Sequence, residues 1–581
     1  MKSVYNKIMA GIFCIGMLNA CDISEFPYSS VTDDELASNE SSIETITLGN
    51  YSYMKTHVFH TAIHYVGEYT SDNIVFSGQS TSSTFNIYNY QRIPNNGVLT
   101  DLWTYSYKTI VNCNKVISSA QEGISGDIDH LIGENYFLRA MLYHYLVITF
   151  GKEYHIASAS DLAVPLKLTA DADDYPSRAT VKQVYEQIIK DLKKAEELMG
   201  GSGIEKNACY ANVWAAKALL SRVYLYMHDY TNAETYATDV IEHSGKMLLT
   251  NVQYKTMNEL VPESNPEAIF AIRMLKDIDY ETSLTGILYT IIDGAGYGEV
   301  YASQSLLDAF AKYPNDVRST FIVPQYEGVS DGATQSQEIC FISENFFYNN
   351  DKTPAEDPLH RHYYRFQPVE KDGNNYMIKV DNKKDFFEYQ SSQVQAHPDG
   401  NLYVVARQVH RNESGEVDGR AEWREYTVQI QNTMQKRNDY PKYFINKVSY
   451  QEKQALLYSP MLFRLSEMYL NRAEARYYLN NEGGAISDMN VIKERAGIPE
   501  YDATKDGNVL DAILDEARKE FYCEAHRKYD LLRNDKVIDR HYPGCHDRGA
   551  ETSVVQEKTL LQIEQHTLET RSFMHSIESF T

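Results

Sequence analysis

Apolar positions recur at helical spacing, every three or four residues, through much of the first 243 residues and again near the end of the chain. This pattern predicts helices within residues 42–119, 128–150, 180–199, 208–243 and 459–534. Residues 244–458 carry clusters of Gly, Pro, Asn and Asp, with short alternating runs such as Tyr403-Val404-Val405. We therefore expect a mostly α protein with an irregular, loop-rich insertion that contains short strands.

Two of the helical stretches have the pattern of a helix-turn-helix repeat. In residues 215–241 the apolar and small positions are interrupted at His228-Asp229, and a second helix is expected to begin near Asn232. In residues 466–497 the expected break is Gly483-Gly484. Alanine at a crossing point lets two helices approach closely, as in tetratricopeptide-type pairs. The prediction is a tetratricopeptide-like α/α superhelix formed by residues 43–243 and 459–535, with the insertion at 244–458.

The N-terminal segment has the pattern of an export signal. Lys2 and Lys7 precede an apolar stretch that is too short to span a membrane, so residues 1–20 are predicted to be a signal peptide. Leu18-Asn19-Ala20-Cys21 fits a bacterial lipobox, in which the cysteine sulfur and the new amino group are acylated. Cys21 is therefore the predicted lipidation site. The alternative is an ordinary secretory signal in which this cysteine is incidental.

Residues 21–42 are rich in Ser, Asp, Glu and Asn and have little apolar periodicity, which predicts a lipidated tether. Asp22 and Glu25 directly follow the cysteine. Acidic residues at this place accompany transport to the outer face of the outer membrane in some Gram-negative bacteria. The expected location is thus the outer membrane, held through lipid and exposed at the cell surface.

Composition narrows the classes of partner. The 581 residues have a formal charge of −25, which argues against nucleic acid as a partner. The cysteines beyond Cys21 are widely scattered and form no CxxC pair, so buried thiols are expected rather than a disulfide framework. The 46 tyrosines are unusual. A tyrosine ring can stack on a sugar or a peptide while its hydroxyl forms a hydrogen bond, although most of these rings should pack between helices.

Sequence motifs of catalysis and cofactor binding do not occur. There is no GxSxG elbow, P-loop, HExxH or dinucleotide-binding glycine fingerprint. His57, His60 and His64 share a helical face and are the nearest approach to a metal cluster, but no acidic ligand stands at a set spacing, so a polar helix face is the preferred interpretation. We predict a binding protein, not an enzyme, without cofactor or metal.

Eight stretches resemble the SusD/RagB family and occur in that family's order. They cover almost the whole chain after the leader: EYTSDN (68–73), LWTYSYKTIVNCNKVI (102–117), ENYFLRAMLYHYLVITFG (134–151), SRATVKQVYEQIIKDLKKAEELM (177–199), ANVWAAKALLSRVYLYMHDYTNAETYATDVI (211–241), ESNPEAIF (263–270), FRLSEMYLNRAEARYY (463–478) and DEARKEFYCEAHRKYDLLRND (515–535). One departure is Ala525, where the family usually has Gly. The resemblance implies that residues 43–581 form one SusD-like domain.

The resemblance also implies a function. Members are surface lipoproteins that capture glycans and deliver them to a SusC-like TonB-dependent transporter, so an oligosaccharide ligand and such a transporter are the expected partners. Capture of a peptide, as in RagB-like members, is one alternative. A repeat scaffold for envelope assembly without a small ligand is another.

Ligand contacts are implied in two places. The first precedes the helix that contains Trp103 and offers Tyr88, Tyr90, Arg92, Asn95 and Asn96, with Asp72 in the TSDN motif orienting that loop or touching ligand. The alternatives are ordinary loop packing for the tyrosines and a turn cap for the aspartate.

The second place is GAGYGEVY, residues 294–301, where three glycines free the backbone beside Tyr297 and Tyr301. A glycine-rich loop that carries two tyrosines can close over a saccharide, and a structural turn is the alternative. Trp103 lies at helical spacing with Tyr107 and Ile110 and is expected in the core.

Overall fold

The structure is a computed structural model that describes residues 39–56, 60–76, 82–90, 96–279, 285–328, 335–344, 346–348, 354–356, 362–437, 440–540 and 542–543. The predicted signal peptide, Cys21 and most of the predicted tether lie outside the described residues. Within the described part of the chain, no helix is long and apolar enough to cross a membrane.

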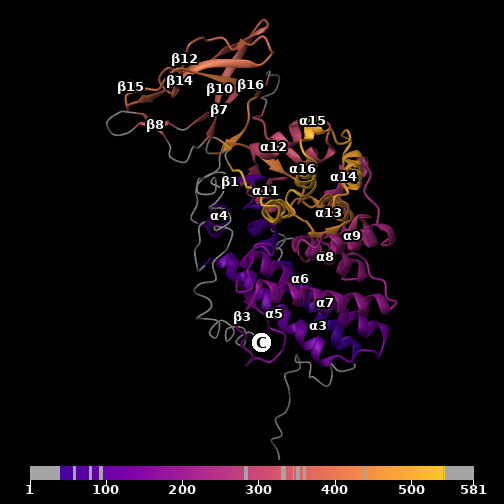
Figure 1. The fold of residues 1–581 in the computed structure, drawn as a ribbon. Helices are drawn as coiled ribbons and strands as arrows, with labels where there is room; N and C mark the ends of the chain where they lie inside the picture. The colour runs from indigo at the N-terminus through magenta and orange to yellow at the C-terminus, as the bar shows by residue number, and fades with distance from the viewer. Residues whose placement is uncertain are drawn as a thin grey trace, which may run out of the picture.

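Long helices form the body of the molecule. Figure 1 shows them stacked in layers, with a sheet at one end of the molecule. Most of their apolar side chains join one large core cluster. The helices of the body are α3 (Glu40–Thr56), the π-helix η1 (His60–Glu68), α5 (Gly97–Ser119), α6 (Gly126–Phe150), α7 (Val181–Gly201), α8 (Val213–Tyr226), α9 (Tyr230–His243), α13 (Leu465–Tyr478), α14 (Glu482–Ala496), α16 (Val509–Phe521) and α17 (Arg527–Arg533).

Shorter helices and paired strands connect these layers. The short helices are α4 (Ser83–Tyr88), α10 (Asn251–Tyr254), α11 (Thr285–Tyr289), α12 (Gln304–Ala311) and α15 (Ala503–Asp506). The two-stranded pairs are β1 (Ile74–Phe76) with β5 (Val300–Ala302), β2 (Leu162–Pro165) with β3 (Arg178–Thr180), β4 (Ala268–Ala271) with β20 (Met461–Arg464), β6 (Ile322–Pro324) with β19 (Tyr443–Ile445), β8 (Phe346–Tyr348) with β9 (Pro354–Glu356), and β17 (Lys436–Arg437) with β18 (Tyr440–Pro441).

Both predicted helix pairs are present, and the mostly α class is confirmed. Between α8 and α9 the backbone turns at His228, whose φ is +61°, and Asp229 caps α9 by accepting from the Asn232 backbone N–H. Between α13 and α14 the turn is at Asn480, also at φ +61°, and Asn481 caps α14. The predicted break at Gly483-Gly484 is therefore wrong by three residues, because the asparagines supply the left-handed turn and the cap.

The continuous helical pattern predicted for residues 42–119 is interrupted. Strand β1 and the short helix α4 stand between η1 and α5, and Asn96 caps the start of α5 by accepting from the backbone N–H groups of Val98 and Leu99. The stretch from Ile74 to Phe76 is fully buried and extended because it pairs with β5, a partner more than 200 residues away in sequence. Tertiary pairing overrides local periodicity here.

The middle insertion is more regular than predicted. Eight of its strands form one antiparallel sheet, ordered β11-β10-β7-β16-β14-β12, with β13 and β15 also paired to β14. Their bounds are β7 (Gln337–Glu344), β10 (His362–Asp372), β11 (Asn375–Ile378), β12 (Phe387–Tyr389), β13 (Gln395–Ala396), β14 (Leu402–Arg411), β15 (Val417–Arg420) and β16 (Arg424–Asn432). The sheet has its own apolar cluster, to which Ile339, Phe341 and Val404 belong.

A buried cluster of ion pairs surrounds Glu520 on α16, which is 0% exposed. Its carboxylate binds the guanidinium groups of Arg464 and Arg495 and lies 3.2 Å from Nη1 of Arg318. Burial alone would raise the pKa of the Glu520 carboxyl, but the three arginines outweigh burial and hold the pKa well below its usual value. The cluster joins α16 to α14, β20 and residue 318 of the insertion.

A second ion pair ties the N-terminal segment to the same region. Asp72 accepts from Nε and Nη2 of Arg527 at 2.9 and 3.0 Å, and Nη2 of Arg518 lies 3.4 Å from its carboxylate. Burial raises the pKa of Asp72, but Arg518 and Arg527 lower it further, to about 2. The residue is 3% exposed, so this fork–fork contact is an internal anchor.

The backbone conformation at Ala525 explains why glycine is usual at this position in the family. This residue has φ +65°, a conformation that favours glycine. A side-chain carbon built at Gly67 of η1 would stand 2.3 Å from the Cβ of Ala525. Gly67 thus provides the space that the Ala525 methyl group occupies.

Replacing Glu520 by alanine should strongly destabilise the fold. The change leaves the buried charges of Arg464, Arg495 and Arg318 without their shared partner, so the free energy of unfolding should fall by about 3–5 kcal/mol. Urea denaturation at pH 7 measures it. Glu370→Ala, which breaks an exposed pair with Lys379, is the matched control and should cost less than about 1 kcal/mol. Equal losses in the two variants would contradict this role of the cluster.

The contribution of Asp72 should depend on pH. Because its pKa is lowered in the folded state to about 2, its stabilisation is complete above the ordinary value near 3.8 and is lost as the pH falls toward 2. Asp72→Asn should therefore lower the free energy of unfolding by about 2 kcal/mol at pH 7, a deficit that shrinks below about pH 4. Urea denaturation from pH 7 to pH 3 tests this, with exposed Asp173→Asn as control. A deficit that is the same at every pH would contradict it.

Candidate functional site

The two predicted ligand-contact places lie together. β1 pairs with β5 in antiparallel register, with Ile74 opposite Ala302 and Phe76 opposite Val300. Beyond the strands, Ser303 donates from Oγ to the Asp72 carbonyl at 2.6 Å and from its backbone N–H to the Asn73 carbonyl at 2.9 Å. Segments that are more than 200 residues apart in sequence therefore form one junction, which Figure 1 shows where the helical body meets the sheet.

Most of the predicted residues of this junction face inward. Tyr88 is 0% exposed, and the Arg540 guanidinium carbon lies 4.1 Å from its ring centroid. Tyr90 is 5% exposed and has φ +53°, and its hydroxyl donates to the Thr70 carbonyl. Asn96 is 3% exposed, caps α5 and donates from Nδ2 to the Ser83 carbonyl at 2.9 Å.

Tyr301 is also fully buried and packs on Phe444, with ring centroids 5.9 Å apart. Asp72 is held in its arginine fork. In this conformation Asp72, Tyr88, Tyr90, Asn96 and Tyr301 present almost no surface to a ligand and support the junction from within. The physical reason is that each uses its ring or polar group inside the protein. Their direct contact with a ligand stays a prediction. Arg92 and Asn95 lie outside the described residues.

Tyr297 differs from these residues because it is 62% exposed. It lies on residues 290–299, called here the Tyr297 loop, in which Gly294, Gly296 and Gly298 all have positive φ. A side-chain carbon at Gly296 would stand 2.2 Å from the Thr290 carbonyl oxygen, and one at Gly298 would stand 2.7 Å from the Phe444 ring. Glycine is thus required at both positions.

The backbone of the Tyr297 loop folds back on α11. The Tyr297 N–H donates to the Ile287 carbonyl at 2.6 Å, and the Glu299 N–H donates to the Leu288 carbonyl at 2.8 Å. An ion pair that sequence reasoning missed lies beside it, between Glu299 Oε1 and Arg437 Nη2 at 3.3 Å. No local signal marks a pair so far apart in sequence. The result is a preformed loop that holds one aromatic ring in solvent next to charged groups.

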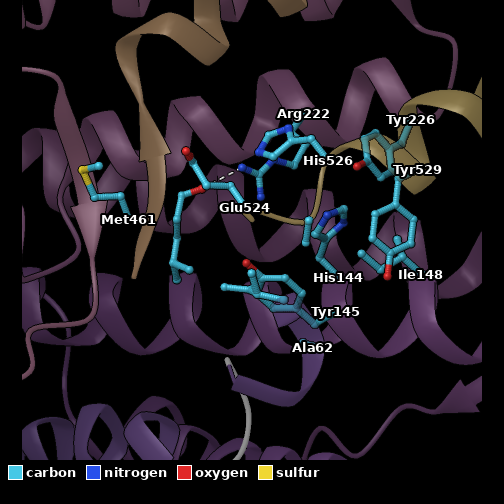
Figure 2. Close-up of a pocket in the computed structure, with 13 residues that line it drawn as sticks. Ala62, His144, Tyr145, Ile148, Arg222, Tyr226, Met461, Glu524, His526 and Tyr529 are labelled. Carbon is cyan, nitrogen blue, oxygen red and sulfur yellow. Dashed lines mark hydrogen bonds between the residues drawn. The ribbon is translucent and has the colours of Figure 1, made fainter. Parts of the chain in front are cut away.

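The internal cavity shown in Figure 2 is too small for a sugar or a peptide. It is lined by His144 and Tyr145 of α6, Arg222 of α8, and His526 and Tyr529. Its volume of about 20 Å³ accommodates about one water molecule. Arg222 is bound by Glu467 at 2.6 Å and by the Leu462 carbonyl at 2.7 Å, so these side chains act as scaffold.

The sequence also singles out the histidines, the cysteines and Trp103. Among the described residues, no group of three or more potential ligands is placed to hold a metal ion. His64 is 1% exposed, while the side chains of His57 and His60 are outside the described part. Cys113, Cys209, Cys340 and Cys523 are free thiols. Trp103 lies in the core as predicted, 7% exposed, and packs on Tyr107 and Phe150.

Comparison with known sequences finds relatives that all are SusD or SusD-like proteins. Residues 24–225 match a family described as starch-binding and associating with the outer membrane, and residues 266–574 match the SusD family. A SusD-like protein of Formosa agariphila is 21% identical over 548 residues, 91% of each chain. The starch-binding protein SusD of Bacteroides thetaiotaomicron is 39% identical over 72 residues, 12% of each chain.

Solved structures agree on the fold. A putative sugar binding protein from Bacteroides vulgatus superposes with a TM-score of 0.61 and 25% identity, covering 92% of this chain and 97% of that one. Surface glycan-binding protein A of Bacteroides thetaiotaomicron, solved in complex with laminarihexaose, superposes with a TM-score of 0.58 and 17% identity, covering 92% and 98%. Because the family match at residues 266–574 alone spans more than half of the sequence, this chain belongs to the SusD family.

Proposed function

We propose that this protein is a surface-exposed lipoprotein that binds an oligosaccharide and delivers it to a SusC-like TonB-dependent transporter in the outer membrane. Membership of the SusD family supports this, as does the description of the N-terminal match as starch-binding and associating with the outer membrane. A structural neighbour that carries laminarihexaose adds support for a glycan ligand. The leader and Cys21 supply the lipid anchor in this proposal.

The observation that carries the site is the exposed ring of Tyr297 on a loop whose backbone is already ordered. A flat ring held in solvent can stack on the apolar face of a pyranose without further ordering, while Glu299 and Arg437 offer hydrogen bonds to hydroxyl groups. The buried side chains of Tyr88, Tyr90, Tyr301, Asp72 and Asn96 support this surface from below. Arg92 and Asn95 remain proposed contacts.

Binding in this proposal breaks no bond. Stacking and hydrogen bonds hold the sugar, and release to the transporter requires only dissociation or a change in the surrounding loops. The tether at residues 21–42 keeps the domain beside the transporter while allowing it to move, which raises the effective concentration of one for the other.

Loss of the Tyr297 ring should weaken glycan binding. Tyr297→Ala should reduce affinity for a bound polysaccharide about tenfold, because a stacking surface is removed. A glycan panel followed by isothermal titration measures this. Tyr53→Ala, at a 43% exposed tyrosine of α3, is the control and should bind normally. Binding of peptides but of no glycan, or release of cleaved glycan fragments, would overturn the proposal.

Cys21 should carry the membrane anchor. Cells that produce the full chain should incorporate radiolabelled palmitate into it, and Cys21→Ser should abolish both the label and retention in the outer-membrane fraction, because no acyl chain can be attached. Protease added to intact cells should degrade the wild-type protein. A labelled Cys21→Ser protein, or full protection from external protease, would contradict the proposed location.

A further inference from the structure

The sheet of the insertion curls until its last strand, β12, reaches β10, the second strand from the other end. β12 and β10 are separated by three strands in the sheet order, yet the Tyr389 hydroxyl of β12 donates to Oε1 of Gln367 on β10 at 3.2 Å. Gln367 also donates from Nε2 to the Asp385 carboxylate at 3.3 Å, just before β12. Inside the curl, the rings of Phe341 and Phe387 lie edge to face at 5.4 Å. The sheet is therefore close to a barrel with a seam between β10 and β12.

The seam stays open because β10 lacks a second partner along part of its length. Among the described strands, β11 pairs with β10 only from Val369 to Asp372, and the Lys379 N–H donates to the Pro368 carbonyl at 2.9 Å, whereas residues 362–367 have β7 as their one strand partner. A depression of about 750 Å³ lies along this edge, within the size range of ligand sites. We call it the seam groove, defined by Glu327, Glu338, Tyr364 to Pro368, Lys384 to Phe387, Tyr389, Gln408 to His410, Thr433 and Lys436.

One rim of the seam groove carries an exposed aromatic ring on an ordered backbone. Phe386 is 65% exposed, which is unusual for phenylalanine. Its carbonyl accepts from the Val409 N–H at 2.8 Å, and the preceding Asp385 accepts from the Asp381 N–H at 2.6 Å. Arg411 donates from Nε to the Asp385 carbonyl at 2.8 Å. The backbone under the ring is thus ordered, so a ligand can stack on the ring without ordering this part of the backbone.

The opposite wall provides a second ring and fixed polar groups. Phe366 of β10 is half-buried, and Nζ of Lys436 lies 4.1 Å from its centroid. Lys436 is held by Glu338 at 2.7 Å, and Glu338 is itself 2% exposed. The amides of Gln367 and Gln408 also line the groove but are 5% and 7% exposed, so they support its wall, while the half-buried Thr433 hydroxyl and the exposed Lys384 can reach a ligand. Rings for stacking and polar groups that can bind sugar hydroxyls are therefore present together.

The charges of the lining are balanced. Three cations, Arg365, Lys384 and Lys436, face three carboxylates, Glu327, Glu338 and Asp385. A polyanionic ligand would meet as many carboxylates as cations, and the whole chain carries −25, so nothing in the groove favours an acidic polymer. A neutral chain of sugars matches both the balanced charge and the aromatic walls.

We propose that the seam groove is a second binding site, for a neutral oligosaccharide stacked on Phe386, separate from the Tyr297 loop. This inference rests on the proposed glycan-binding function and adds a site on the inserted sheet. The two sites are structurally connected: Tyr364 of β10 donates to Oε1 of Gln304 on α12 at 2.6 Å, and Arg437, which follows Lys436, pairs with Glu299. A polysaccharide long enough to reach both would bind more tightly than a short fragment.

The test uses the purified protein with a neutral polysaccharide that binds it and with a short oligosaccharide of the same sugar. Native mass spectrometry should count two short oligosaccharides on the wild-type protein and one on Phe386→Ala. Affinity of Phe386→Ala for the polysaccharide, measured by titration, should fall about tenfold because one stacking surface is lost. Phe386→Trp, which keeps a flat ring, should retain both sites, and Tyr53→Ala is the control for an exposed aromatic elsewhere.

The outcomes separate this inference from the proposed function. Wild-type binding that is unchanged in Phe386→Ala, in number and in affinity, overturns the seam site and leaves glycan binding at the Tyr297 loop intact. The seam site is also overturned if Tyr297→Ala binds only one short oligosaccharide while Phe386→Ala still binds two. If the wild-type protein binds no neutral glycan at all, the proposed function fails and the seam site fails with it. Because Phe386 is largely exposed, the thermal unfolding midpoint of the Phe386→Ala protein should stay near that of the wild type.

Discussion

The shared carboxylate of Glu520 is the contact on which the rest of the structure depends. It is buried among Arg464, Arg495 and Arg318, which belong to β20, α14 and the segment before β6. Burying so many charges costs free energy unless each has a partner, so the elements can only come together in the arrangement that pairs all of them. One helix, α16, thereby fixes the end of the helical body relative to the middle insertion.

The surface that we propose for ligand binding is built on this cluster. Arg518 of α16 and Arg527 of α17 hold the segment of Asp72, and that segment aligns β1 with β5. The Tyr297 loop leads directly into β5, so its exposed ring stands on a base that is fixed by buried ion pairs. Binding groups carried by a rigid support lose little conformational entropy when a ligand arrives. A helical repeat scaffold can in this way present a sharply defined aromatic surface.

Several features could be predicted from the sequence because they follow from local physics. Helical spacing and buried alanines such as Ala215 and Ala237 identified the helix pairs, and ordered motifs identified the family. The sheet could not be predicted, because long strands such as β10 and β14 mix apolar and polar residues and pair across loops rich in turn residues. Sequence also could not distinguish the buried ring of Tyr88 from the exposed ring of Tyr297, since burial is decided by distant partners such as Arg540. Phe386 had no signal at all before the curl of the sheet was known.

We propose above that glycan is captured where the junction meets the sheet. Amide hydrogen exchange with and without bound polysaccharide tests it most directly, because it locates the ligand without any substitution. Capture there should give new protection within residues 285–300 of the junction and within residues 381–389 and 405–411 of the sheet, with the helices α3 and α7 unchanged. Protection confined to those two helices, or absent from both the junction and the sheet while polysaccharide is bound, would contradict it.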